Sequence, residues 1–285
     1  MTLGYLLLGI QPVFLKLALE RGFTTAESVA LRFLVSLCLV VPFALWNRQS
    51  LRTQQPAVWL LRGILGGLAV LLYFESVRLA GAGLGTLLNY TYPIWANLLS
   101  FLIGERPSRM IWLALPLAIV GTVLVVAPTA DSGIGRGELC GLTSAALAGG
   151  AIVCIKRLRR TDGELTIIAS FSLVGLLLAI PALPLFAATP STSAGQAGWL
   201  FALLVGLLSF FGHVYFTRGY KETSIQLGTV LSLIVPALAA GFGWLVLRER
   251  LAPSALTGAG LIGLGVLLIA VRERMTRRPG DVAPT

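Results

Sequence analysis

Hydrophobic runs of about twenty residues alternate along the chain with short breaks that contain charged residues, proline or glycine. A helix that crosses a hydrocarbon core of about 30 Å needs about 20 apolar residues. The runs therefore predict an all-α membrane protein with ten transmembrane helices. The first five cover residues 1–20, 26–46, 57–77, 82–103 and 110–127, and the second five cover 137–156, 163–186, 197–219, 224–247 and 253–272.

Composition agrees with this pattern. Of the 285 residues, 56% are hydrophobic and 12% are charged, and a soluble domain carries about twice that share of charge. The lipid bilayer is therefore the expected surrounding. Neither an HExxH, a GxSxG nor a P-loop pattern occurs, and a single histidine excludes a cluster of histidine ligands, so we expect neither an enzyme nor a bound cofactor.

The net charge of +10 does not indicate nucleic-acid binding, because the cations are spread between apolar runs. Under the positive-inside rule they report orientation instead. Fourteen Lys and Arg residues fall on the side of both termini, and only Arg21, Arg78, Arg136, Arg248 and Arg250 fall on the other. This distribution predicts an inner-membrane protein with cytoplasmic N- and C-termini.

An internal repeat divides the chain. Leu84-Gly85-Thr86 with Pro93 recurs as Leu227-Gly228-Thr229 with Pro236, and Lys16 at the end of one span matches Lys156 at the end of another. The repeat predicts two five-helix units, residues 1–130 and 131–275, followed by a cytoplasmic tail, 276–285. An odd number of spans inserts the second unit with inverted topology, which is typical of transporters that work by alternating access.

These motifs resemble the EamA-type drug/metabolite transporters. The resemblance rests on Lys16, Leu31-Arg32-Phe33, Tyr73-Phe74, Arg78, Pro93, Gly104-Glu105-Arg106, Gly137-Glu138-Leu139, Pro236 and Glu249-Arg250. It implies a ten-helix secondary transporter, usually an exporter, with a cavity lined by the first, third, fourth, sixth, eighth and ninth spans. The stretch Asn89-Tyr90-Thr91-Tyr92-Pro93 is similar to bacterial aromatic amino acid exporters.

Prolines near mid-membrane are candidate hinges, because proline removes a backbone donor and leaves a carbonyl without its helical partner. Pro12, Pro93 and Pro236 occupy such depths. Simple packing kinks are the alternative.

Polar and aromatic residues at similar depth are candidate substrate contacts, with helix packing as the alternative for each. His213 could also carry protons; without that role, the protein would be a facilitator. The candidates are Gln11, Tyr73, Asn89, Tyr92, Trp95, Ser144, His213 and Ser232.

Together these features predict a secondary transporter that exports small organic metabolites, with amino acids, especially aromatic ones, as the favoured substrates. Export of drugs or of another metabolite class is the alternative. An intramembrane hydrolase built on Ser209 and His213, or a structural membrane protein, is a remote alternative.

The charged residues within the spans give further expectations. Arg32 is expected to snorkel or to pair with Glu75. A sugar nucleotide is disfavoured as substrate, because no intramembrane cation pair is evident from the sequence. Glycines 258 and 260 could pack within the fold or support a homodimer.

Overall fold

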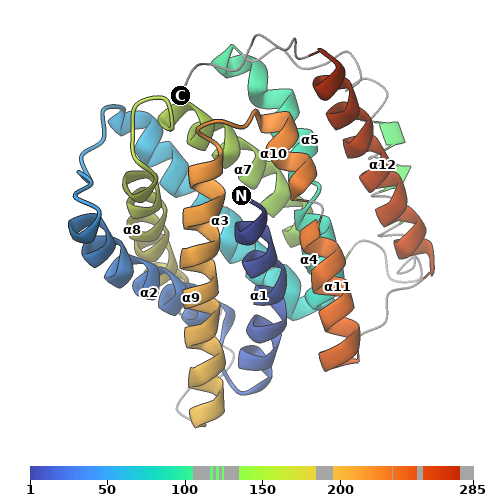
Figure 1. Ribbon diagram of the computed structural model, residues 1–285. Coiled ribbons are helices and arrows are strands. Elements are labelled where there is room, and N and C mark those ends of the chain that lie inside the picture. Colours follow the sequence, from blue (N-terminus) through green and yellow to red (C-terminus); the bar gives the residue numbers. More distant parts are fainter. Residues whose placement is uncertain are drawn as a thin grey trace.

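A computed structural model of the chain describes residues 1–104, 116, 117, 120, 121, 124, 135–183, 195–232, 234–248 and 253–276. Every regular element within these residues is helical (Figure 1). The elements are α1 (Thr2–Glu20), α2 (Thr25–Trp46), α3 (Pro56–Ala80), α4 (Ala82–Asn89), α5 (Tyr92–Leu99), the 3-10 helix η1 (Ser100–Ile103), α7 (Arg136–Leu158), α8 (Glu164–Ala182), α9 (Gln196–Gly219), α10 (Ile225–Leu231), α11 (Ile234–Leu247) and α12 (Pro253–Thr276).

Six helices in the described part of the chain, α1, α2, α3, α7, α8 and α9, are long and apolar enough to cross a membrane. Their bounds lie within a few residues of the spans expected from the hydrophobic runs, so a multi-pass helical membrane protein is confirmed. Most of the expected span 110–127, the motif residues Glu105, Arg106, Glu249 and Arg250, and nearly all of the tail 276–285 lie outside the described residues.

Two expected spans are broken, which corrects the prediction of continuous helices over 82–103 and 224–247. The first divides into α4 and α5, and the second into α10 and α11 (Figure 1). In each case a proline follows the break, Pro93 as the second residue of α5 and Pro236 as the third of α11. A proline has no N–H for the carbonyl four residues earlier, and its ring clashes with that carbonyl. These carbonyls belong to Asn89 and Ser232.

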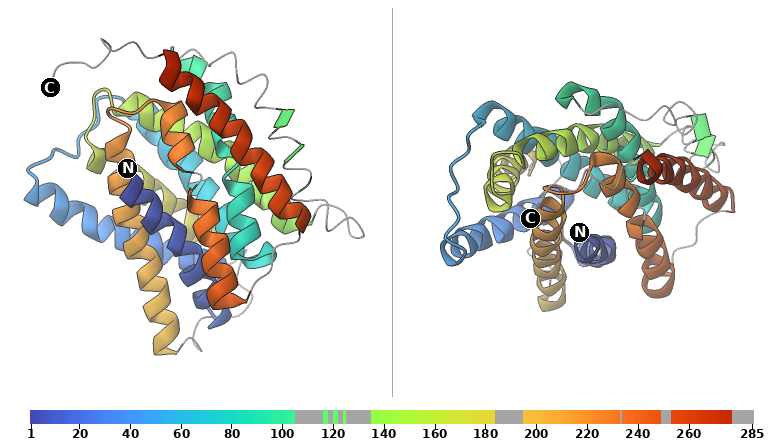
Figure 2. Two further views of the ribbon diagram at one scale, coloured as in Figure 1. Left: turned by 45° about the vertical axis from the view of Figure 1, so that its right-hand side comes forward. Right: turned by 45° about the horizontal axis from the view of Figure 1, so that its top comes forward.

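The long helices pack against one another through a few extensive interfaces. The most extensive interfaces are those of α3 with α7 and of α1 with α9, and α8 lies against both α2 and α3. Figure 2 shows α12 at one edge of this bundle, and in the described residues its main contact is with α10. Close approach depends on glycine: a Cβ on Gly4 of α1 would come within 2.7 Å of the Gly212 carbonyl oxygen of α9. The absence of a side chain therefore sets the α1–α9 distance.

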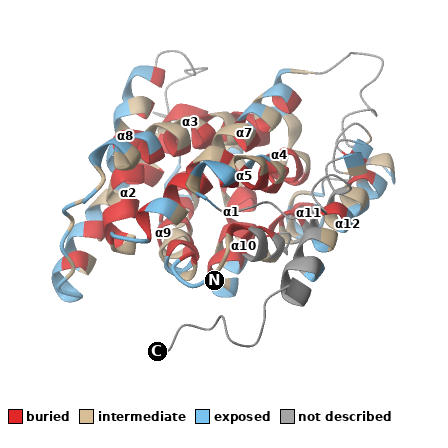
Figure 3. Cartoon of the chain, turned by 90° about the horizontal axis from the view of Figure 1, so that it is seen from above, coloured by how far each residue is buried: buried red, intermediate tan, exposed pale blue. Residues whose placement is uncertain are grey.

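Burial is greatest where the helices face one another, and exposed residues lie on the outer faces (Figure 3). Phe33, Phe74 and Phe171 are among the aromatic side chains buried in the interior. Large apolar side chains nevertheless remain on the outside, including Leu177 at 59% exposed. In a bilayer such residues face acyl chains, so they can be apolar without being covered by protein.

The start of α2 is fixed by a capping box, and one face of the helix is buried. Thr24 and Glu27 form a capping box: the Glu27 N–H donates to Thr24 Oγ1, and the Thr24 N–H donates to Glu27 Oε2. From that point Ser28, Arg32 and Ser36 recur at intervals of four residues, and all three are buried. The capping box therefore defines where α2 begins, and the four-residue spacing puts Arg32 on the same buried face as Ser28 and Ser36.

Candidate functional site

A cavity of about 110 Å³ lies inside the bundle. A cavity needs about 10–15 Å³ of such volume to hold one water molecule, so this cavity admits several water molecules or a small organic group. The cavity is surrounded by residues from eight helices and by Tyr90, which lies between α4 and α5. The eight helices are α1, α2, α3, α4, α5, α7, α8 and α9. The lining residues are Leu8, Gln11, Arg32, Arg62, Gly66, Ala69, Val70, Tyr73, Phe74, Asn89, Tyr90, Tyr92, Ala148, Ala151, Ile152, Ile155, Phe171, His213 and Phe216.

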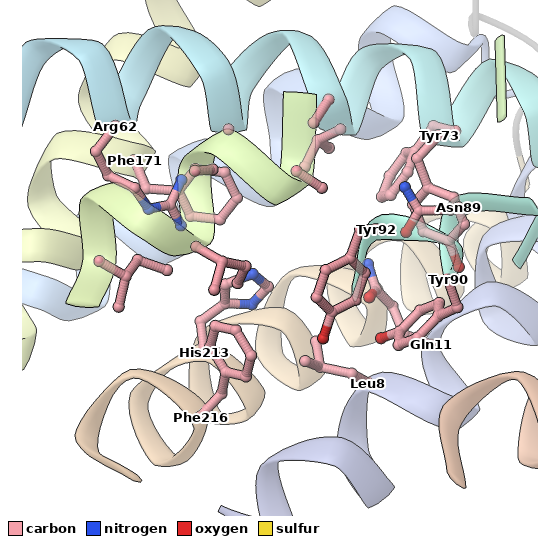
Figure 4. A pocket seen from close by; sticks show the side chains of 18 of the residues that line it. Leu8, Gln11, Arg62, Tyr73, Asn89, Tyr90, Tyr92, Phe171, His213 and Phe216 are labelled. Carbon is pink, nitrogen blue, oxygen red and sulfur yellow. The ribbon is translucent and has the colours of Figure 1, made fainter. Parts of the chain in front are cut away.

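The two ends of the cavity differ in chemistry (Figure 4). At one end Arg62, Phe171 and His213 are drawn together, and at the other are polar and aromatic groups that include Gln11 and Asn89. We call the first the cationic end and the second the amide end. A ligand in this cavity would therefore meet positive charge at one end and amide groups at the other.

Arg32 supplies one charge of the cationic end. It is 2% exposed, and its Nε donates to Ser209 Oγ at 2.7 Å. The guanidinium carbon lies 5.0 Å from the ring centroid of Phe171. This contact and the hydrogen bond hold the guanidinium away from lipid and beside the cavity.

Arg62 supplies the second charge. It is 3% exposed, and its guanidinium carbon lies 4.2 Å from the Phe171 ring centroid. One turn farther along α3, Gly66 has no side chain, and a Cβ there would collide with Arg62 Nη1 and lie 2.9 Å from Phe171. Gly66 therefore provides the space in which the guanidinium lies against the ring.

Neither charge has a full set of partners. Within the described residues, Arg32 Nη1 and both Nε and Nη1 of Arg62 are buried without a hydrogen-bond acceptor. A cation–π contact contributes about 2 kcal/mol when desolvated, whereas burying an ion costs several kcal/mol. The ring contacts offset part of that cost. The buried Arg159 at the end of α7 also has an Nε without a partner among the described residues, but it pairs with Glu164 at 3.3 Å. Burial lowers the pKa of Arg159, and the Glu164 carboxylate opposes that shift.

At the amide end, Asn89 is held by a short hydrogen-bonded chain. The Asn89 amide Nδ2 donates to Ser144 Oγ at 2.6 Å, and Ser144 Oγ donates to the Ala69 carbonyl at 2.7 Å. Because the single hydroxyl hydrogen goes to Ala69, the serine accepts from the amide nitrogen, which assigns the Asn89 amide orientation. Nearby, Gln11 Nε2 is buried without a partner among the described residues.

His213 is fixed by a backbone contact. Its Nδ1 lies 2.9 Å from the Ser209 carbonyl, which only accepts, so Nδ1 carries a hydrogen. The Ser209 hydroxyl instead donates to the Val205 carbonyl at 2.6 Å and accepts from Arg32. The hydroxyl and the imidazole are therefore not arranged as the nucleophile–base pair that the remote hydrolase hypothesis required.

The structure brings together five of the eight residues expected to contact substrate, namely Gln11, Tyr73, Asn89, Tyr92 and His213. The other three lie outside the lining. Ser144 sits behind Asn89, and Trp95 on α5 is 43% exposed. Ser232 donates to the Thr229 carbonyl at 2.6 Å and interacts with the side chain of Tyr92.

Sequence reasoning missed Arg32 and Arg62 as cavity residues, and two expectations about them are corrected. Arg32 neither snorkels nor pairs with Glu75, because Glu75 binds Arg78 and Thr25 instead. An intramembrane cation pair exists, whereas none was evident from the sequence. The available signal was that both arginines lie inside apolar spans, where an ionisable residue is a functional candidate by default.

The lining also differs from the span set that the family resemblance implied. The first, third, fourth, sixth and eighth spans contribute as expected. α2 and α8 contribute as well, through Arg32 and Phe171, and among the described residues none from α10 or α11 lines the cavity. The additional helices contribute Arg32 and the Phe171 ring to the cationic end, beside Arg62 from α3 and His213 from α9.

By fold and site, the molecule is a multi-pass helical membrane protein with an internal, mostly apolar cavity that carries a few polar and charged groups, the architecture of a transporter. The chain belongs to the EamA-like transporter family, whose model matches residues 1–127 and 135–271.

Several relatives support this assignment. The pseudopaline exporter of Pseudomonas aeruginosa is 30% identical over 253 residues, which cover 88% of this chain and 86% of the relative. An uncharacterized transporter of Archaeoglobus fulgidus is 29% identical over 95% of both chains. The riboflavin transporter of Vibrio cholerae is 24% identical over 93% of this chain and 90% of its own.

A solved crystal structure has the same fold. It aligns with a TM-score of 0.66 and 22% identity, covering 94% of this chain and 98% of the other. The chain is therefore a membrane transporter for small molecules by family, with a fold already seen experimentally.

Proposed function

We propose that the protein is a secondary transporter that exports small organic metabolites, amino acids foremost, by alternating access around the cavity. The observation that carries the proposal is the lining itself, in which Asn89 from the first half and His213 from the second line one cavity. Polar groups at both ends would orient a substrate, while Tyr73, Tyr90 and Phe216 form apolar walls.

Ten spans in two inverted repeats are part of this proposal, and the helix contacts support it. In the repeat, α1, α2, α3 and α4–α5 correspond to α7, α8, α9 and α10–α11. The contact of α1 with α9 then corresponds to that of α7 with α3, and the contact of α2 with α9 to that of α8 with α3. Likewise α1 packs on α11 as α7 packs on α5. A pseudo-two-fold axis accounts for all three pairs.

Glycine contacts repeat in the same way. A Cβ on Gly9 would meet Leu238 at 2.8 Å, and a Cβ on Gly149 would collide with Trp95. Gly9 and Gly149 are 140 positions apart, and Trp95 and Leu238 are 143 apart. The glycines therefore hold α1 against α11 and α7 against α5 in equivalent ways.

Two lysines give a further match at the ends of helices. Lys16 Nζ donates to the Arg78 carbonyl at 3.3 Å, and Lys156 Nζ donates to the Tyr220 carbonyl at 3.3 Å. Each lysine lies near the end of the first helix of its half and contacts the end of the third helix of the same half. Such paired contacts are expected where two halves exchange conformations.

The broken helices support alternating access. Pro93 and Pro236 lie 143 positions apart and follow equivalent breaks, and broken helices at repeat-related positions are common near transporter binding sites. We assign both prolines to hinges. Pro12 is assigned to the same role, although α1 continues through it without a break.

Amino acids remain the favoured substrates on chemical grounds. The cationic end suits a carboxylate, the amide end can hydrogen-bond an amino group through Asn89, and the aromatic walls suit a flat side chain. The relative from Pseudomonas aeruginosa is named as an exporter, which favours outward transport. We place the protein in the inner membrane with cytoplasmic termini, as the positive-inside rule predicts.

Flux through reconstituted vesicles tests the proposal. The purified full-length chain in proteoliposomes is expected to give saturable movement of at least one compound from a panel of labelled amino acids, with aromatic and acidic members included. Asn89→Ala is expected to impair that flux, while Asn47→Ala, on an exposed helix end, serves as the control. Absence of saturable flux for the whole panel would reject amino acids as substrates.

Flux measured with and without a pH gradient distinguishes proton-coupled transport from facilitated diffusion. If His213 carries protons, an imposed gradient will change the initial rate, and His213→Gln will remove that dependence. A facilitator will show the same rate with and without the gradient.

A further inference from the structure

Arg32 and Arg62 determine the electrostatics of the cavity. Of the described residues that line it, none is an aspartate or glutamate, and no ion pair of either arginine occurs in the described part of the chain. Each arginine lies about two turns inside its helix, Arg32 from the start of α2 and Arg62 from the start of α3. The two guanidinium groups therefore present formal positive charge that no neighbouring carboxylate balances.

The cavity lining includes buried donors that lack a partner. Within the described residues, the fully buried lining atoms without partners are Gln11 Nε2, Arg32 Nη1, and Nε and Nη1 of Arg62. All four are donors. Since buried polar groups are normally satisfied, a molecule with acceptor groups is the complementary ligand for this part of the lining.

The two cations are close enough to serve one small molecule. Both guanidinium carbons lie near the Phe171 ring, at 5.0 Å and 4.2 Å from its centroid. They are therefore no more than 9.2 Å apart, the sum of those distances. A planar guanidinium binds a carboxylate through two parallel hydrogen bonds, which neutral groups do not match in strength.

We infer that the cavity recognises a substrate with two carboxylates, one for each of Arg32 and Arg62. This inference rests on the proposed function, because it assumes that the cavity is the transport site, and it narrows the substrates to those that carry a second carboxylate. A neutral zwitterion brings no net charge, so it leaves the two buried cations uncompensated. A dianion compensates both.

A phosphate monoester has the same charge as a dicarboxylate but concentrates it on one group. Arg32 and Arg62 come from different helices, and each guanidinium offers its own planar pair of donors to a carboxylate, which favours two anionic groups over one. A phosphate compound is therefore the informative competitor in a binding test.

Four compounds with a common phenyl ring test the inference: phenylsuccinate, phenylacetate, phenylalanine and phenyl phosphate. Affinity for the purified full-length chain in detergent is measured by isothermal titration calorimetry. Phenylsuccinate is expected to bind at least about tenfold more tightly than phenylalanine or phenylacetate, because one charge-assisted contact changes affinity by about this factor or more. It should also bind more tightly than phenyl phosphate.

Substitutions of the two cavity arginines test whether they cause the tighter binding of phenylsuccinate. Arg32→Gln and Arg62→Gln are each expected to weaken phenylsuccinate binding at least about tenfold while changing phenylalanine binding much less. Arg159→Gln is the matched control, since Arg159 is also a buried arginine but lies outside the cavity and pairs with Glu164. Its phenylsuccinate affinity should equal that of the unmodified chain.

Three results would overturn the inference: equal affinity for phenylsuccinate and phenylalanine, no binding of any of the four compounds, or unchanged phenylsuccinate affinity in both cavity variants. Tighter binding of phenyl phosphate would reject the carboxylate assignment. These outcomes are separate from the flux experiment, because binding in detergent requires no transport. Dianion binding without amino acid flux would reject amino acids as the transported substrates and keep this inference, whereas flux of zwitterions without dianion preference would reject only this inference.

Discussion

Asn89 and Ser144, 55 positions apart, are joined by a 2.6 Å hydrogen bond in which the amide nitrogen donates to the serine hydroxyl. Both residues stand out in the sequence as polar groups at mid-membrane depth, but only Asn89 lines the cavity. Ser144 passes its own hydrogen to the Ala69 carbonyl on α3. The pair therefore couples the break after α4 to α7 and α3.

Replacing Ser144 by Ala should affect stability more than transport. The substitution leaves Asn89 Nδ2 and the Ala69 carbonyl without a shared partner, and interhelical hydrogen bonds in membranes contribute about 0.6 to 2 kcal/mol. We expect a measurably lower melting temperature in detergent, with substrate KM changed by about threefold or less. A larger effect on KM than that of Asn89→Ala would place Ser144 in direct contact with substrate.

Replacing Pro93 by Ala distinguishes a hinge from a packing kink. The new N–H could bond the Asn89 carbonyl and join α4 to α5 in one helix. For a hinge we expect transport to fall about tenfold or more while thermal stability is kept or increased. Pro42→Ala, at an exposed proline inside α2, is the control. Undiminished flux in Pro93→Ala would leave the break with a packing role only.

Gly66→Ala tests the space that holds Arg62. Its Cβ would collide with Nη1, so the guanidinium must leave its position over Phe171. We expect phenylsuccinate affinity to fall by about tenfold, close to the effect of Arg62→Gln. Gly260→Ala, where a Cβ would meet no described atom within 4 Å, should change neither affinity nor melting temperature. Retained affinity in Gly66→Ala would mean that Arg62 finds an equivalent position.

Gly9→Val and Gly149→Val test the repeated glycine contacts. Each valine is forced into the facing helix, the one at position 9 against Leu238 and the one at position 149 against Trp95. Overpacking of this kind costs about 1–3 kcal/mol, so both variants should melt at lower temperature by similar amounts in detergent. A large loss in one variant with none in the other would contradict equivalent roles in the two halves.

The sequence predicted much of the fold because span length depends on a simple balance between apolar residues and bilayer thickness. The ends of α2 and α9 lie within a residue of the expected positions. The sequence marked Pro93 and Pro236 as candidate hinges but did not predict that the helices break before them. A proline does not always divide a helix, since α1 continues through Pro12 and α2 through Pro42.

The sequence predicted Asn89 and His213 of the candidate site, but it did not predict that the two arginines line the cavity. Asn89 and His213 stand out because a polar side chain within an apolar run is costly in lipid and therefore faces the protein interior. Arg32 and Arg62 lie 30 positions apart, and their meeting depends on the rotation of α2 and α3 and on the gap at Gly66. No local pattern encodes that tertiary arrangement.

The two uncompensated arginines have an electrical consequence. Moving one elementary charge through the membrane potential changes its free energy by about 2.3 kcal/mol per 100 mV. An empty carrier that exposes Arg32 and Arg62 first to one side and then to the other would sense this voltage, whereas a carrier neutralised by a bound dianion would not. With a negative cytoplasm, the potential would draw the empty cavity back toward the cytoplasm by up to roughly 4 to 5 kcal/mol at 100 mV. Membrane voltage would then drive the return step of each export cycle.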